Sequence, residues 1–219
     1  IILISVISLL LIAQPDIGQT LLVVFCWAAL IFTSGINIYI LLAIFIAGVS
    51  LLVYLIIYVP RFDYIQGRIF SFFNRETGTH NFQSDKAIES ITSGGFFGKG
   101  IGEGVLKNRV PEAHTDYIIS VISEEFGVVA IMLILLLFLI LIYMVFKKIS
   151  FETNDKVKLI LIGSISLILM QATIHVGVNI RLLPTTGMTL PFLSYGGSSI
   201  ISTSILGGII LNLTKRKIT

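Results

Sequence analysis

One short segment, residues 111–116, carries three side chains that could perform acid–base or metal chemistry. Glu112, His114 and Asp116 lie within five residues in the run Pro-Glu-Ala-His-Thr-Asp. A carboxylate there could accept a proton from a hydroxyl, or bind Mg²⁺ or Mn²⁺, which prefer oxygen ligands. Zinc is not favoured, because zinc sites are built mainly from cysteine and histidine, and this segment offers one histidine, two carboxylates and no nearby cysteine. A structural role is the alternative, since Thr115 or Asp116 would make a good N-cap for a helix beginning near Tyr117.

The glycine-rich stretch of residues 94–104, GGFFGKGIGEG, is a second candidate. Its glycines allow positive φ and the close approach of a backbone to a ligand. The P-loop pattern fails, because Gly98-Lys99 is followed by Gly100 rather than by Ser or Thr, and the dinucleotide fingerprint lacks its third glycine. The stretch is therefore either a flexible turn or one that lets Lys99 and backbone N–H groups meet an anionic group.

The elements that must position these residues are membrane spans. Of the 219 residues, 55% are hydrophobic and only 12% are charged, with a mean hydropathy of +0.98. Windows without interior charge, long enough for a bilayer core of about 30 Å, occur at residues 17–34, 38–59, 126–146 and 159–180. A fifth window, 190–213, contains Pro191 and four glycines, which predicts a broken span.

The opening run of residues 1–13 predicts a helix entered midway, so we expect the C-terminal part of a longer polytopic protein. The predicted fold class is all-α and integral to the membrane: a polytopic helical bundle of about six spans, forming a single transmembrane domain over residues 1–219. Residues 60–116 form a long extracytoplasmic loop within it. Cys26 is the one cysteine and lies inside a span, so no disulfide framework is expected.

Basic residues near the span ends predict the orientation, because cytoplasmic flanks carry an excess of Lys and Arg. They cluster around one short loop and after the last span: Lys147, Lys148, Lys156, Lys158, Lys215, Arg216 and Lys217. This places the Asp16 turn, residues 60–116 and residues 181–191 together on the outer face. The long loop has seven basic and seven acidic residues, so no polybasic patch for nucleic acid is present.

Several polar residues within the spans call for an explanation. Gln171, His175 and Asn179 recur at every fourth residue, which predicts one polar helix face that must meet protein or a wet cavity. Interhelical hydrogen bonding is the favoured use, and a substrate groove is the alternative. Asp16 is expected to cap the following helix. Glu124 and its neighbour could anchor the long loop by contacting its Arg or Lys residues.

Five segments in order resemble the signature segments of the bacterial SEDS family, which includes FtsW and RodA. They are Gln-Pro-Asp-Ile-Gly at 14–18, Ser-Gly-Gly-Phe-Phe-Gly-Lys-Gly at 93–100, Pro-Glu-Ala-His-Thr-Asp at 111–116, Glu-Glu-Phe-Gly at 124–127, and Leu-Pro-Thr-Thr-Gly at 183–187 with Leu-Pro-Phe-Leu-Ser-Tyr-Gly-Gly-Ser-Ser at 190–199. The form of residues 188–191 and of residues 102–104 is more similar to FtsW than to RodA. The resemblance implies a ten-span fold in the bacterial cytoplasmic membrane.

The resemblance also implies an activity: a peptidoglycan glycosyltransferase that polymerises lipid II, with a class B penicillin-binding protein and other divisome or elongasome membrane proteins as partners. Asp116 falls on the essential carboxylate position, as the base for an acceptor hydroxyl or as a ligand of a divalent cation (Mg or Mn). Substrate-binding candidates are Lys99, Lys107, Arg109, Glu112, His114 and Arg181. Thr186 stands where many members have lysine, so one candidate phosphate-binding charge is absent.

Two other function classes stay open. A flippase for a lipid-linked precursor would need polar residues on several helices through the whole depth of the bilayer. A scaffold for division partners would need no carboxylate in the loop. The polar residues of this chain crowd towards the predicted outer face, which favours surface chemistry.

Overall fold

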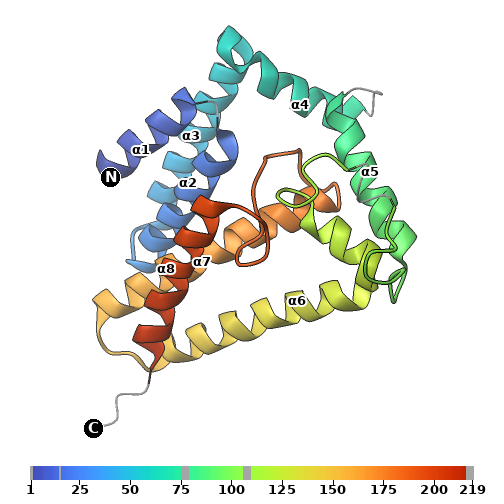
Figure 1. The fold of residues 1–219 in the computed structure, drawn as a ribbon. Helices are drawn as coiled ribbons and strands as arrows, with labels where there is room; N and C mark the ends of the chain where they lie inside the picture. Colours follow the sequence, from blue (N-terminus) through green and yellow to red (C-terminus); the bar gives the residue numbers. More distant parts are fainter. Residues whose placement is uncertain (1, 15, 75–78, 106–109, 216–219) are drawn as a thin grey trace.

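The computed structural model describes residues 2–14, 16–74, 79–105 and 110–215 (Figure 1), and these residues form helices and turns without a strand. The predicted all-helical fold is confirmed. The helices are α1 (Ile2–Ala13), α2 (Ile17–Thr33), α3 (Ile38–Tyr58), a 3₁₀ turn η1 (Pro60–Phe62), α4 (Asp63–Asn74), α5 (Thr79–Gly94), α6 (Ile118–Phe151), α7 (Asp155–Asn179) and α8 (Gly197–Thr214).

Four helices in the described part of the chain are long and apolar enough to cross a membrane: α3, α6, α7 and α8. Two further apolar helices, Leu3–Ala13 and Ile17–Thr33, are shorter. The expected count of about six spans is therefore met only if both shorter helices also cross, and it stays a prediction. Asp16 caps α2 as expected, because its Oδ1 accepts a hydrogen bond from Gln19 N at 3.0 Å.

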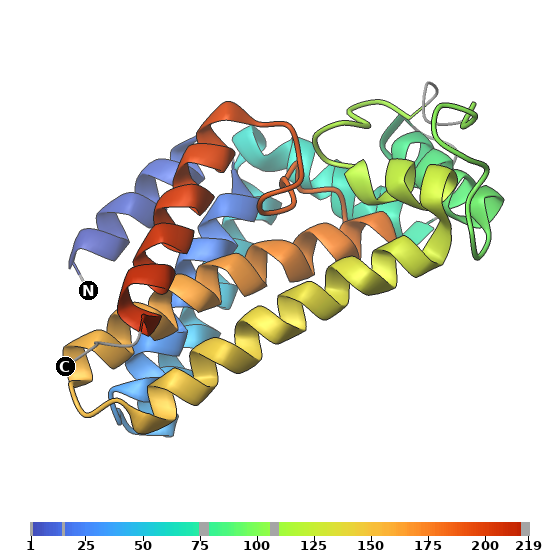
Figure 2. The same ribbon diagram turned by 60° about the horizontal axis from the view of Figure 1, so that its bottom comes forward.

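The helix ends and the connections between helices gather at two opposite ends of the molecule (Figure 2). The connection between α6 and α7 and the last turn of α8 lie at one end, whereas α4, α5 and the turn after α5 lie at the other. Lys147, Lys148, Lys156, Lys158 and Lys215 therefore gather at the first end, as the sequence predicts for a cytoplasmic face. Which end faces out of the cell stays a prediction.

The predicted long loop contains two helices, α4 and α5. In the sequence, Ser84 as a possible N-cap and the glycine pair at 94–95 predict a shorter helix, from residue 84 to residue 93. It is instead the second half of α5, which ends at Gly94 with Gly95 at φ 57°. The glycine stop is confirmed, and the left-handed residue after the helix is the usual C-terminal arrangement.

The last predicted span is broken, as its proline and glycines indicated. Residues 190–196 form a turn, and α8 begins only at Gly197. Ser194 Oγ accepts a hydrogen bond from Leu190 N at 2.8 Å, which satisfies a backbone group that no helix pairs. The segment of residues 181–196 is thus irregular backbone that is held against the helices by side chains.

Candidate active site

The segment that carries Glu112, His114 and Asp116, which we call the acidic turn (residues 110–117), is fixed by a buried apolar cluster. Val110, Ala113 and Tyr117 are buried in it. Their neighbours come from five other parts of the fold: Leu22 of α2, Ala87 of α5, Val121 of α6, Ile174 and Val178 of α7, and Met188 of the segment after α7. The core of this end of the molecule is therefore built around the turn.

Hydrogen bonds from distant residues hold the backbone of the acidic turn. Asn179 Nδ2 donates to Asp116 O at 2.9 Å, from 63 residues away. Ser194 Oγ donates to Thr115 O at 2.7 Å, and Tyr195 N donates to His114 O at 2.9 Å. Three successive carbonyl groups are thus fixed by α7 and the segment of residues 181–196.

The Asp116 carboxylate does not cap a helix, so the structural role considered from the sequence is wrong. The N-cap of α6 is Tyr117, which makes no side-chain capping hydrogen bond. Inside the turn, Asp116 N donates to Glu112 O at 3.0 Å, and Tyr117 N donates to the same oxygen at 3.3 Å. Glu112 O thus pairs the two N–H groups that precede α6, and the Asp116 carboxylate makes no capping hydrogen bond to that helix.

Three segments far apart in the sequence meet beside Asp116. A Cβ on Gly187 would lie 3.6 Å from Asp116 Oδ2. A Cβ on Gly18 would lie 3.2 Å from atoms of Thr186 and Met188, which brings in the turn after Asp16. The Asp16 turn, residues 60–116 and residues 181–191 were predicted to share one face, and the structure brings them together.

Arg68 of α4 completes this site, and the sequence analysis missed it. Its Nη1 donates to Thr185 O at 2.8 Å, and its guanidinium stacks over the Tyr64 ring at 4.2 Å from the centroid. The spacing of Tyr64 and Arg68, four residues apart on one helix face, is the signal that could have singled it out. Arg68 acts electrostatically on both Asp116 and Asp16.

Burial raises the pKa of the Asp116 carboxyl above its usual range, and the nearby Glu112 carboxylate raises it further. The Arg68 charge and a hydrogen bond with Thr115 lower that pKa and only partly offset the rise. Asp116 is therefore a stronger base than an ordinary exposed aspartate, as a carboxylate that takes a proton from a hydroxyl should be.

Buried polar atoms without partners gather at the same place. Within the described residues, four such atoms belong to side chains that touch the acidic turn or residues 185–188: Arg68 Nε, His175 Nε2, Asn179 Oδ1 and Thr186 Oγ1. Buried groups of this kind are rare in folded proteins and point to water, an ion or a ligand. The site thus has unused donors and acceptors besides its carboxylate.

Backbone strain is concentrated in the same segments. Within the described residues, the non-glycine positions with positive φ are Glu112, Arg181 and Phe192, at 54°, 57° and 66°. One lies in the acidic turn and two in the segment of residues 181–196 that packs against it. Such conformations cost about 1–3 kcal/mol each and cluster at functional sites.

Lys99 lies elsewhere, in what we call the glycine turn (residues 94–105). Its ammonium pairs with Glu124 Oε1 at 3.3 Å, and the Glu124 side chain is fully buried. Glu124 also accepts from Ser90 Oγ at 3.2 Å and from Val105 N at 3.0 Å. The expectation that the glutamate pair anchors the loop through a basic residue is confirmed, whereas binding of substrate by Lys99 stays a prediction.

The glycines of that turn serve close packing against a break in α6. Gly127 has φ 77° and ψ −179°, which interrupts the helix. Lys99 N and Gly100 N donate to the carbonyls of Glu124 and Glu125 at 2.9 and 3.0 Å, and Val128 N donates to Gly95 O at 3.0 Å. A Cβ on Gly98 would lie 2.1 Å from Glu125 O. The turn is therefore neither a flexible connection nor free to cradle an anion with these N–H groups.

The other predicted binding residues have different surroundings. Arg181 forms an ion pair with Asp85 of α5, which ties residues 181–196 to the long loop. Glu112 and His114 are exposed beside Asp116 in the acidic turn. Lys107 and Arg109 lie outside the described residues. The structure thus brings together Glu112, His114 and Asp116 with Arg68, and places Lys99 and Arg181 in structural ion pairs.

The polar face of α7 is used for hydrogen bonding, but mostly to the irregular segments beside it; the interhelical bond expected from the sequence is made by Gln171 Nε2, which donates to Ser199 Oγ of α8 at 3.3 Å. Gln171 Nε2 donates to Thr189 O at 2.9 Å, and His175 Nδ1 lies 2.7 Å from Met188 O. Gln171 also lines a cavity of about 220 Å³, together with Gln19 and three leucines, Leu22, Leu167 and Leu206. Five hydroxyl side chains complete its polar lining: Thr189, Ser198, Ser199, Ser202 and Thr203. A larger cavity of about 530 Å³ between α6 and α7 is almost wholly apolar and holds no reactive group.

The fit of a divalent cation depends on the two carboxylates of the acidic turn. Within the described residues, no three His, Cys, Asp or Glu side chains come together as a metal site. Glu112 Oε2 already accepts from Thr115 Oγ1 at 2.9 Å. Mg²⁺ is commonly held by one or two carboxylates together with waters and substrate phosphates. Asp116 and Glu112 therefore fit an ion that substrate helps to hold, but not a protein cage.

Comparisons with known proteins agree with this architecture. The profile of the FtsW/RodA/SpoVE family, described as cell cycle proteins, matches residues 1–218. The probable peptidoglycan glycosyltransferase FtsW of Caulobacter vibrioides is 35% identical over 213 residues, which cover 95% of this chain and 52% of that protein. The probable FtsW of Francisella salina is 36% identical over 217 residues, covering 96% and 53%. The chain thus spans about half the length of the curated relatives it matches.

A solved structure supports the same assignment. A chain from a structure described as coordinating polymerization and crosslinking in a peptidoglycan synthase complex superposes with a TM-score of 0.76 and 26% identity, covering 99% of this chain and 62% of that one. The four membrane-length helices and these similarities identify a multi-pass protein of the bacterial cytoplasmic membrane. The chain belongs to the FtsW/RodA/SpoVE family of cell cycle proteins.

Proposed function

We propose that the full-length protein is a peptidoglycan glycosyltransferase that polymerises lipid II into glycan strands at the outer face of the cytoplasmic membrane. The single observation that carries this proposal is the Asp116 carboxylate. It caps no helix, its pKa is raised by burial, and it lies beside Arg68 where three segments meet. A polymerase needs a base of this kind for its acceptor hydroxyl.

The proposed reaction is a single displacement at an anomeric carbon. The oxygen of an acceptor sugar hydroxyl forms a bond to the anomeric carbon of a lipid-linked donor, and the bond from that carbon to the polyprenyl pyrophosphate breaks. The hydroxyl proton passes to the Asp116 carboxylate. The electron pair of the broken bond leaves on the pyrophosphate oxygen, so negative charge grows there and requires a nearby cation.

Arg68 is our candidate for that cation. Its Nη1 is fixed on Thr185 O and its ring partner is Tyr64, so the guanidinium is held in place before substrate arrives. Its buried Nε has no partner within the described residues and could donate to a phosphate oxygen. Lys99 and Arg181 are less suited, because both are already paired with carboxylates. A divalent cation held by Asp116 and Glu112 would supply further positive charge to the leaving group.

The distribution of polar side chains favours this reaction over translocation of a lipid-linked precursor. The polar lining of the 220 Å³ cavity comes from the first turns of α2 and α8, from Thr189, and from Gln171, which lies eight residues before the end of α7. About one helical turn further along the same helices, the cavity is lined by the apolar side chains of Leu22, Leu167 and Leu206. A flippase would require polar groups through the whole depth of the bilayer.

The test is a direct assay of the purified full-length protein in proteoliposomes with fluorescent lipid II. We expect glycan chains to be visible by gel electrophoresis, with addition of a class B penicillin-binding protein, the proposed partner, raising their yield. Movement of lipid II between leaflets without any polymer would support the flippase instead. Neither polymer nor movement, in a protein that still binds its partner, would support the scaffold.

A further inference from the structure

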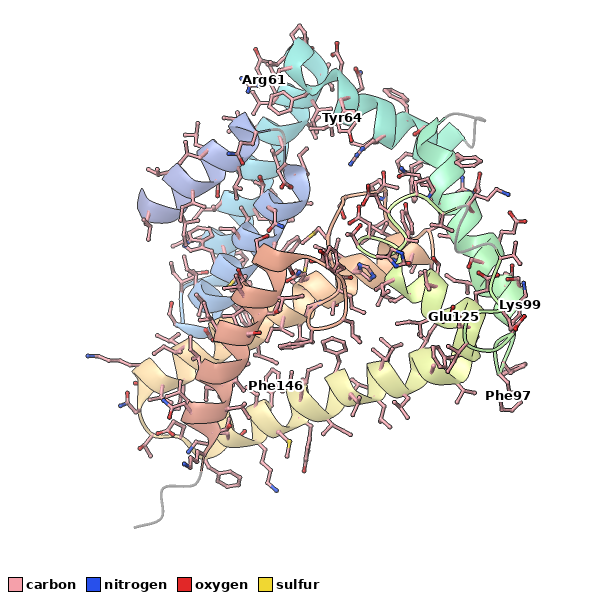
Figure 3. All side chains as sticks on the ribbon, in the orientation of Figure 1. Arg61, Tyr64, Phe97, Lys99, Glu125 and Phe146 are labelled. Atoms are coloured by element: carbon pink, nitrogen blue, oxygen red, sulfur yellow. The ribbon has the colours of Figure 1, made fainter. Side chains whose placement is uncertain are left out.

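The glycine turn presents large apolar side chains that no part of the described chain covers. Phe96, Phe97 and Ile101 have exposed fractions of 75%, 85% and 78%. Single exposed apolar residues are ordinary, but three within six positions form a patch. Figure 3 shows Phe97 pointing away from the helices at the end of the molecule, near Lys99 and Glu125.

Backbone hydrogen bonds fix the depth of this patch relative to the membrane span. Val128 N donates to Gly95 O at 3.0 Å, and Val129 N donates to Phe96 O at 3.3 Å. These two valines lie in the first turn of the charge-free run of residues 126–146. At about 1.5 Å per residue, that run is roughly 30 Å long and matches the hydrocarbon core of a bilayer. The two phenylalanines therefore lie where the hydrocarbon begins.

The charges around the glycine turn mark the same boundary. Two glutamates come immediately before the apolar run. Glu124 is buried and paired with Lys99, and Glu125 accepts a hydrogen bond from Gly102 N at 3.2 Å. On the other side of the boundary, Phe126 and Val129 are 44% and 51% exposed on a helix that spans the membrane. The apolar patch thus continues the surface that α6 presents to lipid and ends where the charges begin.

We propose that the Phe96–Phe97 pair, with Ile101, is a membrane anchor that inserts into the boundary between headgroups and acyl chains of one leaflet. Aromatic rings are enriched at this level in membrane proteins. The anchor holds the end of α5 and the break in α6 at a fixed depth. Since α5 and α6 both pack on the acidic turn, the anchor also fixes the height of Asp116 above the hydrocarbon.

The experiment uses nitroxide spin labels in the full-length protein reconstituted in lipid bilayers, with its other cysteines replaced. Labels are attached to Phe97→Cys, to Val129→Cys as a lipid-facing reference on α6, and to Glu103→Cys as a matched control on the exposed part of the same turn. Collision rates with oxygen, which concentrates in hydrocarbon, and with a water-soluble nickel chelate report the depth of each label.

We expect the ratio of oxygen to chelate collisions at position 97 to approach that at 129 and to exceed that at 103 several-fold. Equal ratios at 97 and 103 would overturn the anchor, because the patch would then face water. Low collision rates with both reagents at 97 would also overturn it, since protein rather than lipid would cover the patch. Both labelled sites on the turn are exposed, so the labels leave the packed core unchanged.

Discussion

The glycine turn and the acidic turn belong to the same long segment and both pack against α6, yet they treat their charges in opposite ways. In the glycine turn, the Lys99 ammonium pairs with the Glu124 carboxylate, and four backbone N–H groups donate to the carbonyls and carboxylates of Glu124 and Glu125. In the acidic turn, the backbone is held from outside and the Asp116 carboxylate caps nothing. The lysine of the glycine turn therefore serves packing, whereas the acidic turn keeps a carboxylate that can do chemistry.

The largest effect on activity is expected for Asp116→Asn, in the acidic turn of the full-length protein. If Asp116 is the general base, the rate of polymerisation should fall by a factor of about 10² to 10⁴, the usual effect of losing such a group. Folding should be nearly unchanged, because the carboxylate is not a cap and the backbone contact from Asn179 remains. The measurements are lipid II turnover and thermal unfolding on the same preparation. Turnover at the wild-type rate would remove the acidic turn from the mechanism.

The opposite behaviour is expected of Gly98→Ala in the glycine turn. Its Cβ would lie 2.1 Å from Glu125 O, and its φ of 77° is strained for alanine. We expect a loss of about 2–4 kcal/mol in the free energy of unfolding, seen as a lower Tm. The control is Gly102→Ala, which has φ 84° but nothing within 4 Å of its Cβ and should cost about 1–2 kcal/mol. Equal losses for both variants would mean that the turn does not pack on the break in α6.

Much of the fold follows from local signals in the sequence. The apolar windows locate α2, α3, α6 and α7, Asp16 caps α2, and proline with glycines breaks the last span. These features depend on residues within one or two helical turns of each other, so a single sequence contains them. The break in α6 at Gly127 was not predicted, because the backbone groups around it are satisfied by residues of the glycine turn that lie 25 or 33 positions earlier in the chain.

The site was only half predictable for the same reason. Asp116 was recognised from its neighbours and from the family resemblance, and its position beside residues 181–191 followed from topology. The roles of the cations were not accessible, because each is decided by a distant partner: Lys99 by Glu124, Arg181 by Asp85, and Arg68 by Thr185, which is 117 residues away. The sequence shows which residues are charged, whereas the tertiary contacts show which charges remain available.

Arg68 is the cation that acts electrostatically on Asp116, so its removal tests whether the acidic turn depends on a nearby positive charge. Arg68→Gln should lower kcat/KM for lipid II by about 10 to 10², since charged hydrogen bonds are worth about 1.5–3 kcal/mol. It should also raise the pKa of Asp116, because the arginine lowers it, and so move the acidic limb of the kcat/KM profile to higher pH. Lys99→Gln is the contrasting variant: it should lower the Tm while leaving that limb in place.

The smallest effect is expected for Glu112→Gln, and its direction is the informative part. The Glu112 carboxylate raises the pKa of Asp116, so its removal lowers that pKa. The deprotonated base then persists to lower pH, and the acidic limb of the kcat/KM profile should move to lower pH, opposite to the shift for Arg68→Gln. At neutral pH the rate should fall less than in Asp116→Asn, because Asp116 remains as the base and the glutamine oxygen can still accept from Thr115 Oγ1. The measurement is the pH dependence of lipid II turnover for wild type and both variants. If both variants moved the limb in the same direction, or if neither moved it, the titrating base would be a group other than Asp116.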